Sequence, residues 1–315
     1  MPSQLSLVAD IGGTNTRVAL ARGGAVLHDS VRRFKNAEAA GLAAVLGAYL
    51  ADLEPGPLDG ACVAVAGPVR DGVGQLTNLD WRIDRDQLGA VTGATKLAVL
   101  NDLQAQGHAV GQLADADLIR LLPQPPASVQ AARLVVGLGT GFNAAPIYDT
   151  AGGRFVPPSE CGHITLPRSS PGLAALSETL TRDHGFAAVE EALSGRGIVA
   201  VHAHLHRVTL TSIEIMENLK AGDAAATETA RLFVEALGIV MGDLALIHLP
   251  FGGIFLVGGM ARAITPWLAP LGFAETFRAK GRFADFMDQF GIAVVTDDYA
   301  ALSGCAAHLD HLPAS

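Results

Sequence analysis

The sequence predicts an α/β protein with two related domains that face a cleft. Its 315 residues are about twice a nominal domain of ~150 residues, so the chain can form two cores. Apolar residues make up 50% of the chain and charged residues 17%, which excludes intrinsic disorder. A pattern of strand, glycine-threonine turn and strand occurs once in each half, which indicates that the two domains are related.

The first half combines hairpin strands with an alternation of strands and helices. Apolar runs bounded by turn residues predict strands over residues 5–10, 17–20, 25–33, 61–66 and 96–100. Helices are expected over residues 37–53, with Asn36 as the cap, and over residues 103–113. This order of elements predicts a mixed sheet with helices on its faces.

The second half begins with the same pattern. A strand at 134–136 enters the glycine turn at 137–141, and a strand at 143–148 leaves it; further elements are expected as a helix at 224–249, strands at 254–257 and 292–295, and a helix from 299. We therefore expect a small α/β domain formed by residues 1–113 and 301–315, and a large α/β domain formed by residues 114–300.

Charge and cysteine content restrict the partners and the compartment. The net charge is −9 and no Lys/Arg cluster is interleaved with aromatics, so neither nucleic acid nor a membrane surface is expected as a partner. Cys62, Cys161 and Cys305 are too widely spaced for a disulfide framework or a CxxC metal site. The amino terminus lacks the basic and apolar regions of a signal peptide. We expect a cytoplasmic protein with small-molecule partners.

The two glycine-threonine turns are candidate phosphate-binding loops. The second turn is followed by a strand pattern instead of a helix, which argues against a dinucleotide fingerprint, and no GxxxxGK[ST] motif occurs. A hairpin turn of Gly and Thr can point backbone N–H groups and a hydroxyl at phosphate oxygens. For either turn alone, an ordinary glycine hairpin is the simpler interpretation.

Carboxylates lie at two strand ends. Asp10 precedes the first glycine turn, where it could hold Mg²⁺ through water beside phosphate oxygens. Asp102 follows Asn101 at the carboxyl end of another strand, where α/β sheets bind ligands, so it is a candidate general base. Glu160 and His163 lie three positions apart, which supplies too few ligands for a metal site.

Several short segments, taken in chain order, form a more specific pattern. They are DIGGTN at 10–15, AGPV at 66–69, TN at 77–78, ND at 101–102, GLGTG at 137–141, ECGH at 160–163, Glu190 ahead of LSG at 193–195, and FGGIFLVGG at 251–259. This set resembles the bacterial glucokinase family over nearly the whole chain.

The resemblance implies a fold and an activity. The family has the actin-like fold, so we expect two ribonuclease-H-like (actin-like ATPase) domains around a cleft. Its members use ATP and Mg²⁺ to phosphorylate the 6-hydroxyl of D-glucose, which gives glucose 6-phosphate for glycolysis. A homodimer is also implied. The residue types agree with this chemistry, because phosphoryl transfer requires positioned phosphates and one carboxylate to accept the hydroxyl proton.

The resemblance also implies roles for individual residues. Asp102 matches the catalytic base and Asp10 the residue facing the metal. The positions that hold the sugar are matched by Asn78, Asn101, Asp102, Glu160, His163 and Glu190. The nucleotide-binding positions are matched by Gly12, Gly13, Thr14 and Asn15 in the first phosphate loop, Gly139, Thr140 and Gly141 in the second, and Gly258 and Gly259 beside the adenosine pocket.

Two departures from the family pattern affect these expectations. Asn143 stands where the family usually has a small residue, so we expect its side chain to narrow the approach to the nucleotide. Cys161 replaces the first glycine of the usual Glu-Gly-Gly-His and places a thiol beside the expected sugar site.

Three alternatives stay open. The chain could phosphorylate another hexose or an amino sugar, use polyphosphate in place of ATP, or be a non-catalytic sugar-binding sensor. The presence of both Asp10 and Asp102 argues against a sensor. A DNA-binding sugar repressor is not expected, since no helix-turn-helix precedes the first strand and residues 164–180 lack the cysteines of the related zinc motif.

Overall fold

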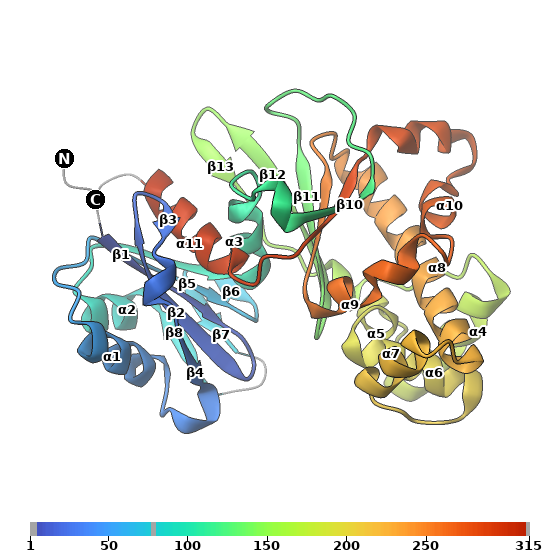
Figure 1. The fold of residues 1–315 in the computed structure, drawn as a ribbon, viewed down its shortest axis with the longest axis horizontal. Helices are drawn as coiled ribbons and strands as arrows, with labels where there is room; N and C mark the ends of the chain where they lie inside the picture. The colour runs from blue at the N-terminus through green and yellow to red at the C-terminus, as the bar shows by residue number, and fades with distance from the viewer. Residues whose placement is uncertain (1–4, 77–79, 313–315) are drawn as a thin grey trace. The chain divides into compact units, whose positions relative to one another are not determined.

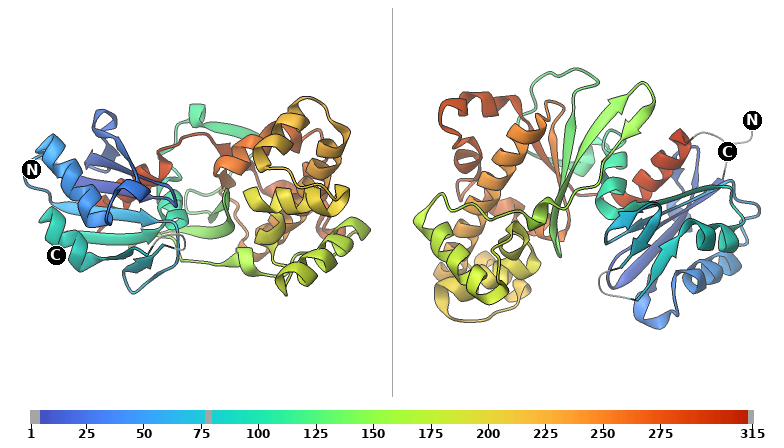
Figure 2. Two further views of the ribbon diagram at one scale, coloured as in Figure 1. Left: turned by 90° about the horizontal axis from the view of Figure 1, so that it is seen from below. Right: turned by 180° about the vertical axis from the view of Figure 1, so that it is seen from behind.

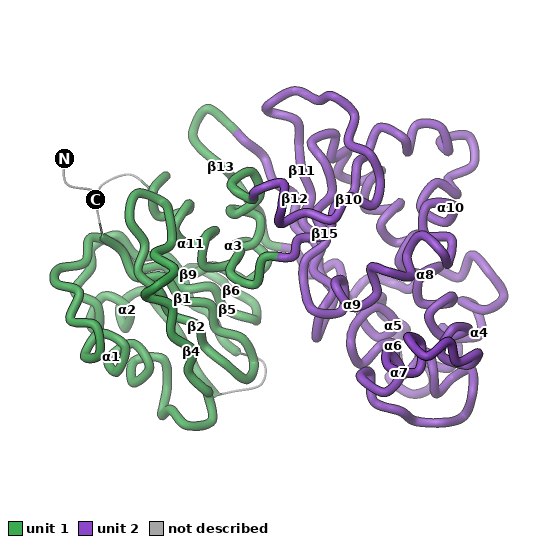
Figure 3. Tube along the Cα trace, viewed as in Figure 1, with its two compact units in different colours: residues 1–113, 150–158, 297–315 green, residues 114–149, 159–296 purple. Residues whose placement is uncertain are grey.

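The computed structural model describes residues 5–76 and 80–312. The chain divides into two compact units, which Figure 3 colours separately. Unit 1 comprises residues 1–113, 150–158 and 297–315, and unit 2 comprises residues 114–149 and 159–296.

Unit 1 is built on a mixed sheet (Figure 1). Its strands are β1 (Leu5–Ile11), β2 (Asn15–Arg22), β3 (Ala25–Val26), β4 (Arg32–Lys35), β5 (Gly60–Val65) and β9 (Lys96–Asn101). The strand order is β3-β2-β1-β5-β9, with β4 also pairing with β2. β1 is antiparallel to β2 and parallel to β5, which is parallel to β9, so the carboxyl ends of β1, β5 and β9 share one edge.

Helices cover both faces of this sheet, as the view from behind in Figure 2 also shows. They are α1 (Leu42–Leu53) and α2 (Arg85–Thr92) on one face, and α3 (Asp102–Ala109) and α11 (Ala300–His311) on the other. Successive side chains of a strand point to opposite faces. Leu7 and Ala9 therefore join the core with α1, whereas Val8 joins the core with α11. Unit 1 also contains β13 (Gly153–Phe155) and a small sheet of β6 (Val69–Arg70), β7 (Val73–Gln75) and β8 (Arg82–Asp84).

The sheet of unit 2 repeats this topology. Its strands are β10 (Leu118–Leu122), β11 (Arg133–Leu138), β12 (Phe142–Thr150), β14 (Ile254–Val257) and β15 (Ile292–Val295). β11 is antiparallel to β12 and parallel to β14, which is parallel to β15. The order β12-β11-β14-β15 thus has the same strand directions as β2-β1-β5-β9, and the repeat expected from the two glycine turns is present.

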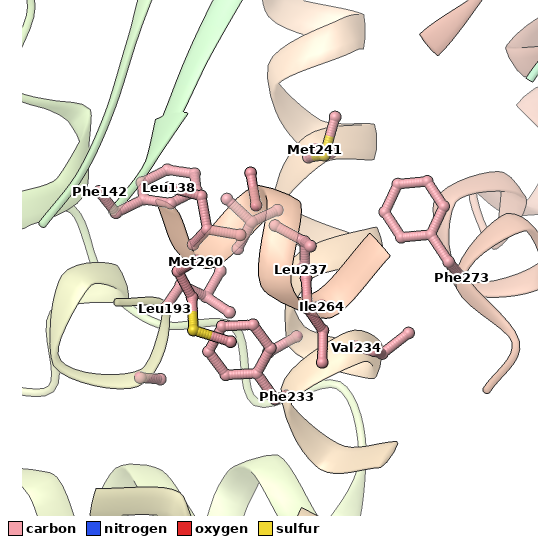
Figure 4. Packing of buried hydrophobic residues seen from close by; sticks show 14 of the residues in the cluster. Leu138, Phe142, Leu193, Phe233, Val234, Leu237, Met241, Met260, Ile264 and Phe273 are labelled. Carbon is pink, nitrogen blue, oxygen red and sulfur yellow. The ribbon is translucent and has the colours of Figure 1, made fainter. Parts of the chain in front are cut away.

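The helices of unit 2 surround a large apolar core. They are α4 (Pro171–His184), α5 (Val189–Ala192), α6 (Gly195–His206), α7 (Ser212–Lys220), α8 (Ala224–His248), α9 (Gly259–Leu268) and α10 (Phe273–Arg278). Figure 4 shows Leu138 and Phe142 in this core with Leu193 and Met260. Since Leu138 and Phe142 flank the second glycine turn, both ends of that turn are anchored.

Three predicted elements differ from the structure. Asn36 is not a helix cap, because α1 begins at Leu42 after Gly41, and Asn36 instead begins a 3₁₀ turn at Asn36–Glu38. The strand expected at 25–33 is interrupted by a 3₁₀ turn at His28–Ser30, whose buried Ser30 hydroxyl accepts a hydrogen bond from the Leu20 amide at 2.8 Å. The helix expected to reach residue 113 ends at Ala109, shortly before Gly111 at φ 101°.

Within residues 5–76 and 80–312, no helix combines the length and the hydropathy that a membrane crossing requires.

Candidate active site

The first glycine turn connects β1 to β2 in unit 1. The Gly12 amide donates to the Asn15 carbonyl at 3.0 Å, which closes the turn. Gly13 and Thr14 at its tip are exposed. Their backbone amides and the Thr14 hydroxyl are the kind of donor that binds phosphate oxygens.

Asn36 supports this turn from a distant part of the sequence. Its side-chain amide donates to the Gly12 carbonyl at 2.7 Å, and its side-chain oxygen accepts from the Thr16 hydroxyl at 2.8 Å. Its backbone amide donates to the Thr14 carbonyl at 2.9 Å. The sequence pattern assigned Asn36 to a helix cap and therefore missed this role.

Asp10 lies near the end of β1, opposite Arg17 on β2. The Arg17 guanidinium donates to Asp10 Oδ2 at 3.2 Å. Burial raises the pKa of the Asp10 carboxyl, and the charge and hydrogen bond of Arg17 oppose that shift. In the described ranges, no group of three or more His, Cys, Asp or Glu side chains is arranged to hold a metal ion. A single carboxylate still fits Mg²⁺, which usually keeps several waters and takes phosphate oxygens as further ligands.

Asn101 and Asp102 lie at the same edge of the sheet as the first glycine turn, because Ile11, Val65 and Asn101 are aligned across β1, β5 and β9. Asn101 caps α3: its side-chain oxygen accepts from the Leu103 amide at 3.0 Å, and its side-chain amide donates to the Gly67 carbonyl at 2.9 Å.

Asp102 is the first residue of α3 and is half-buried. Its Oδ1 accepts from the Leu103 amide at 2.8 Å. The carboxylate is therefore held at a helix amino terminus, where the helix dipole favours negative charge.

The second glycine turn, in unit 2, is packed against two other backbone segments. The Gly139 amide donates to the Gly141 carbonyl at 2.9 Å, and the Gly195 amide at the start of α6 donates to the Gly139 carbonyl at 2.8 Å. Gly258 has φ 110°, and a Cβ there would lie 2.5 Å from the Leu138 carbonyl oxygen. The amino terminus of α9, which begins at Gly259, therefore lies beside the turn, and helix amino termini favour phosphate.

Glu190 of α5 is hydrogen-bonded to the second glycine turn. Its Oε2 accepts from the Phe142 amide at 2.8 Å, and a Cβ at Gly141 would lie only 2.4 Å from that oxygen. Arg196 donates to Glu190 Oε1 and, at 3.2 Å, to Glu191. This ion pair orients the Glu190 carboxylate. Arg196 was not among the expected site residues.

Glu160 and His163 lie beside Glu190. The two exposed residues belong to one turn, in which the His163 amide donates to the Glu160 carbonyl at 3.1 Å. A Cβ at Gly162 would lie 1.9 Å from the Phe142 carbonyl oxygen and 3.5 Å from Glu190 Cβ. Only glycine permits this close approach. The turn that carries Glu160 therefore packs against both the second glycine turn and Glu190.

The Asn143 side chain, expected to narrow the approach to the nucleotide, is held by another segment of the chain. It bonds to Ser159 and Cys161, because the segment that carries them offers both a carbonyl and an amide to the Asn143 side chain.

The predicted residues thus gather in two groups, one in each unit. Unit 1 holds Asp10, Gly12, Gly13, Thr14, Asn15, Asn101 and Asp102, and unit 2 holds Gly139, Thr140, Gly141, Glu160, His163, Glu190, Gly258 and Gly259. Asn78 lies outside the described residues.

Comparison with known proteins gives one consistent result. The glucokinase family model matches residues 7–312. A glucokinase of Xanthomonas campestris pv. campestris is 32% identical over 320 residues, covering 98% of this chain and 95% of its own. The crystal structure of a glucokinase from an Antarctic psychrotroph is 30% identical, covers 98% of this chain and 99% of its own, and has a TM-score of 0.86.

A more distant structure is similar in fold alone. It is a ROK family glucokinase of Streptomyces griseus, crystallised with glucose and AMPPNP, which is 20% identical with a TM-score of 0.63 and covers 97% of this chain and 98% of its own.

Proposed function

The chain belongs to the glucokinase family, and from this membership we propose that it transfers the γ-phosphoryl group of ATP to the 6-hydroxyl of D-glucose. The single observation that carries the proposal is the hydrogen bond between the Phe142 amide, at the end of the second glycine turn, and the Glu190 carboxylate. This hydrogen bond holds a turn that can bind phosphate oxygens next to a group of polar side chains that can bind sugar hydroxyls.

The residues of unit 2 fit a polyol and a nucleotide. Carboxylate and imidazole groups are supplied by Glu160, His163 and Glu190. A carboxylate accepts hydrogen bonds from hydroxyls, and an imidazole can both accept a hydrogen bond from a hydroxyl and donate one to it. The second glycine turn and the amino terminus of α9 supply backbone amides for phosphate oxygens. We propose that these two sets bind glucose and ATP.

The residues of unit 1 fit the chemical step. We propose that Asp102 accepts the proton of the 6-hydroxyl as that oxygen attacks the γ-phosphorus, and that Asn101 binds the sugar beside it. Asp102 begins α3 directly after β9, which places its carboxylate at the edge of the sheet that holds the first glycine turn. The first glycine turn would bind phosphate oxygens.

Asp10 is the residue that would hold Mg²⁺ through water, and the ion would neutralise charge on the phosphates. Asp10 fits this task because it is the next-to-last residue of β1 and lies close to the first glycine turn. The hydrogen bond from Arg17 orients the Asp10 carboxylate toward β2.

We further propose that the chain forms two actin-like domains, one of residues 1–113 with 301–315 and one of residues 114–300. The repeated strand order supports two such domains. The two compact units differ from these bounds in that residues 150–158 and 297–300 belong to unit 1. We also propose a homodimer, as the family resemblance implies, and a cytoplasmic location, which the three free cysteines fit. Light scattering of the purified protein tests the dimer.

The decisive experiment is a coupled assay for ADP release over glucose, mannose, fructose and glucosamine. A parallel assay of sugar phosphate formation compares ATP with polyphosphate. We expect glucose and ATP to give the highest kcat/KM. A higher value for another sugar would identify a different hexose or amino-sugar kinase, and binding without turnover of any sugar would identify a sensor.

A further inference from the structure

Asn143 joins the second strand of the glycine hairpin to the segment that carries Glu160. It is the second residue of β12, and its side-chain oxygen accepts from the Cys161 amide at 3.1 Å and from the Cys161 thiol at 3.5 Å. Its side-chain nitrogen donates to the Ser159 carbonyl. The Ser159 hydroxyl also lies 3.4 Å from the same side-chain oxygen.

These bonds hold the backbone on both sides of Glu160. Ser159 precedes it and Cys161 follows it, while the Glu160 side chain itself is exposed. The side-chain oxygen of Asn143 accepts hydrogen bonds and its side-chain nitrogen donates one. An aspartate at this position would lose the donated hydrogen bond, and an alanine would lose all of them. The Asn143 amide therefore limits the directions in which the Glu160 carboxylate can point.

We propose that Asn143 is a positioning residue for sugar binding, which acts by fixing the turn that presents Glu160. The inference rests on the proposed function and deepens it, because it assigns an effect on sugar affinity to Asn143, a residue of β12 just after the second glycine turn. A carboxylate that must reach a hydroxyl in one geometry gains from such support, since small misplacements weaken binding and turnover steeply.

Kinetics with separate substrates test the proposal. Asn143→Ala is expected to raise the KM for glucose about 5- to 50-fold and to change the KM for ATP less than twofold. The matched control is Thr179→Val, which removes a 2.8 Å side-chain hydrogen bond to His204 elsewhere in unit 2. We expect the control to lower Tm without changing the KM for glucose.

A double-mutant cycle separates positioning from a general loss of stability. If Asn143 acts through Glu160, Asn143→Ala changes the KM for glucose less than twofold in a Glu160→Gln background. The full 5- to 50-fold effect in that background would show that Asn143 acts by another route and would overturn the proposal.

Cys161 supplies a readout that does not depend on catalysis. Cys62 and Cys305 are buried, whereas Cys161 is partly exposed, so a thiol reagent should modify Cys161 first. Burial raises the pKa of the Cys161 thiol, which slows its reaction at neutral pH. Release of the turn in Asn143→Ala is expected to increase the rate of modification about tenfold or more, and the rate in Thr179→Val is expected to match the parent.

Each outcome decides one of the two proposals. A parent enzyme without glucose kinase activity would refute the proposed function, whatever the thiol rates. In an active parent, an unchanged KM for glucose in Asn143→Ala would overturn the positioning role even if the thiol reacts faster. A rise in the KM for ATP instead of glucose would also overturn it.

Discussion

The Asn36 side-chain amide donates to the Gly12 carbonyl at 2.7 Å, across 24 positions of the sequence. Asn36 is only 2% exposed, and Thr16, the donor to its side-chain oxygen, is fully buried. The buried side chain of Asn36 thus holds the base of the first glycine turn, whose tip is exposed. Such support keeps the turn amides in one arrangement when no ligand is bound, which lowers the entropic cost of binding a phosphate.

Asn36→Ala is therefore expected to affect both stability and nucleotide binding. Loss of the amide leaves the Thr16 hydroxyl and the Gly12 carbonyl without this partner, which costs about 1–3 kcal/mol of unfolding free energy. The freed turn should raise the KM for ATP about 3- to 10-fold and leave the KM for glucose within twofold. Urea unfolding and substrate titrations measure both effects.

Asn218→Ala, on α7 of unit 2, is the matched control for loss of an asparagine side chain. It should leave both KM values unchanged. An Asn36→Ala enzyme that is less stable but binds ATP as the parent does would limit Asn36 to a structural role.

Replacement of Asp102 by Asn tests the general base. The substitution keeps the size of the side chain and a hydrogen-bond acceptor near the Leu103 amide, so α3 should remain intact. We expect kcat to fall about 10²- to 10⁴-fold, with glucose affinity by calorimetry changed less than threefold. Turnover within threefold of the parent would refute the assignment.

Gly141 is predicted to accept a side chain only if the Glu190 carboxylate moves away. A Cβ at this position would lie 2.4 Å from Glu190 Oε2, so Gly141→Ala must displace the carboxylate from the Phe142 amide. We expect a loss of about 1–3 kcal/mol in unfolding free energy and a higher KM for glucose.

Gly139→Ala is a matched comparison within the same turn. Its Cβ would approach no atom closer than the Gly259 nitrogen at 4.0 Å, so its effect on Tm should be much smaller. Equal losses of Tm in the two variants would show that the Glu190 contact is not the cause.

The strands could be predicted well from the sequence, because each is an apolar run with turn residues directly before and after it. The strands at 254–257 and 292–295 have the bounds expected, and the two glycine turns fall between strands as predicted. The repeated topology followed from these turns.

The contacts that support the site could not be predicted in the same way. Asn36 has the residue type of a helix cap, and only the fold shows that its side chain reaches Gly12. Arg196 lies six positions after Glu190, across the start of a helix, and its pairing depends on how α5 and α6 meet. The direction of the Asn143 side chain likewise depends on the segment that packs beside β12.

Asp10→Asn should separate stability from activity. Burial raises the pKa of Asp10 above its unfolded value, so the ionised form is less favourable in the folded protein at neutral pH. The neutral variant is therefore expected to have a higher Tm than the parent at pH 8, and this advantage should shrink as the pH falls through the raised pKa. The kcat should drop about 10²-fold or more, with a changed Mg²⁺ titration. A variant with parental kcat and Mg²⁺ dependence would identify Asp10 as a turn former.

His308 is expected to make unit 1 sensitive to acid. It lies on α11, with its ring centroid 4.4 Å from that of His108 on α3. Burial lowers the pKa of His308 from 6.5 to about 4, and the charges of His311 and Arg85 act in the same direction. Because the unfolded chain binds this proton more readily, stability is fully present above pH 6.5 and is lost as the pH falls toward 4.

The shift corresponds to at most about 3 kcal/mol of unfolding free energy. His308→Gln removes the titrating group, so its unfolding free energy should fall less between pH 7 and pH 5 than that of the parent. His28→Gln, on an exposed histidine of the same unit, should keep the parental slope. Urea unfolding at several pH values measures all three proteins. If His308→Gln loses as much stability as the parent over this interval, then a different group causes the acid sensitivity and the buried imidazole at α11 does not.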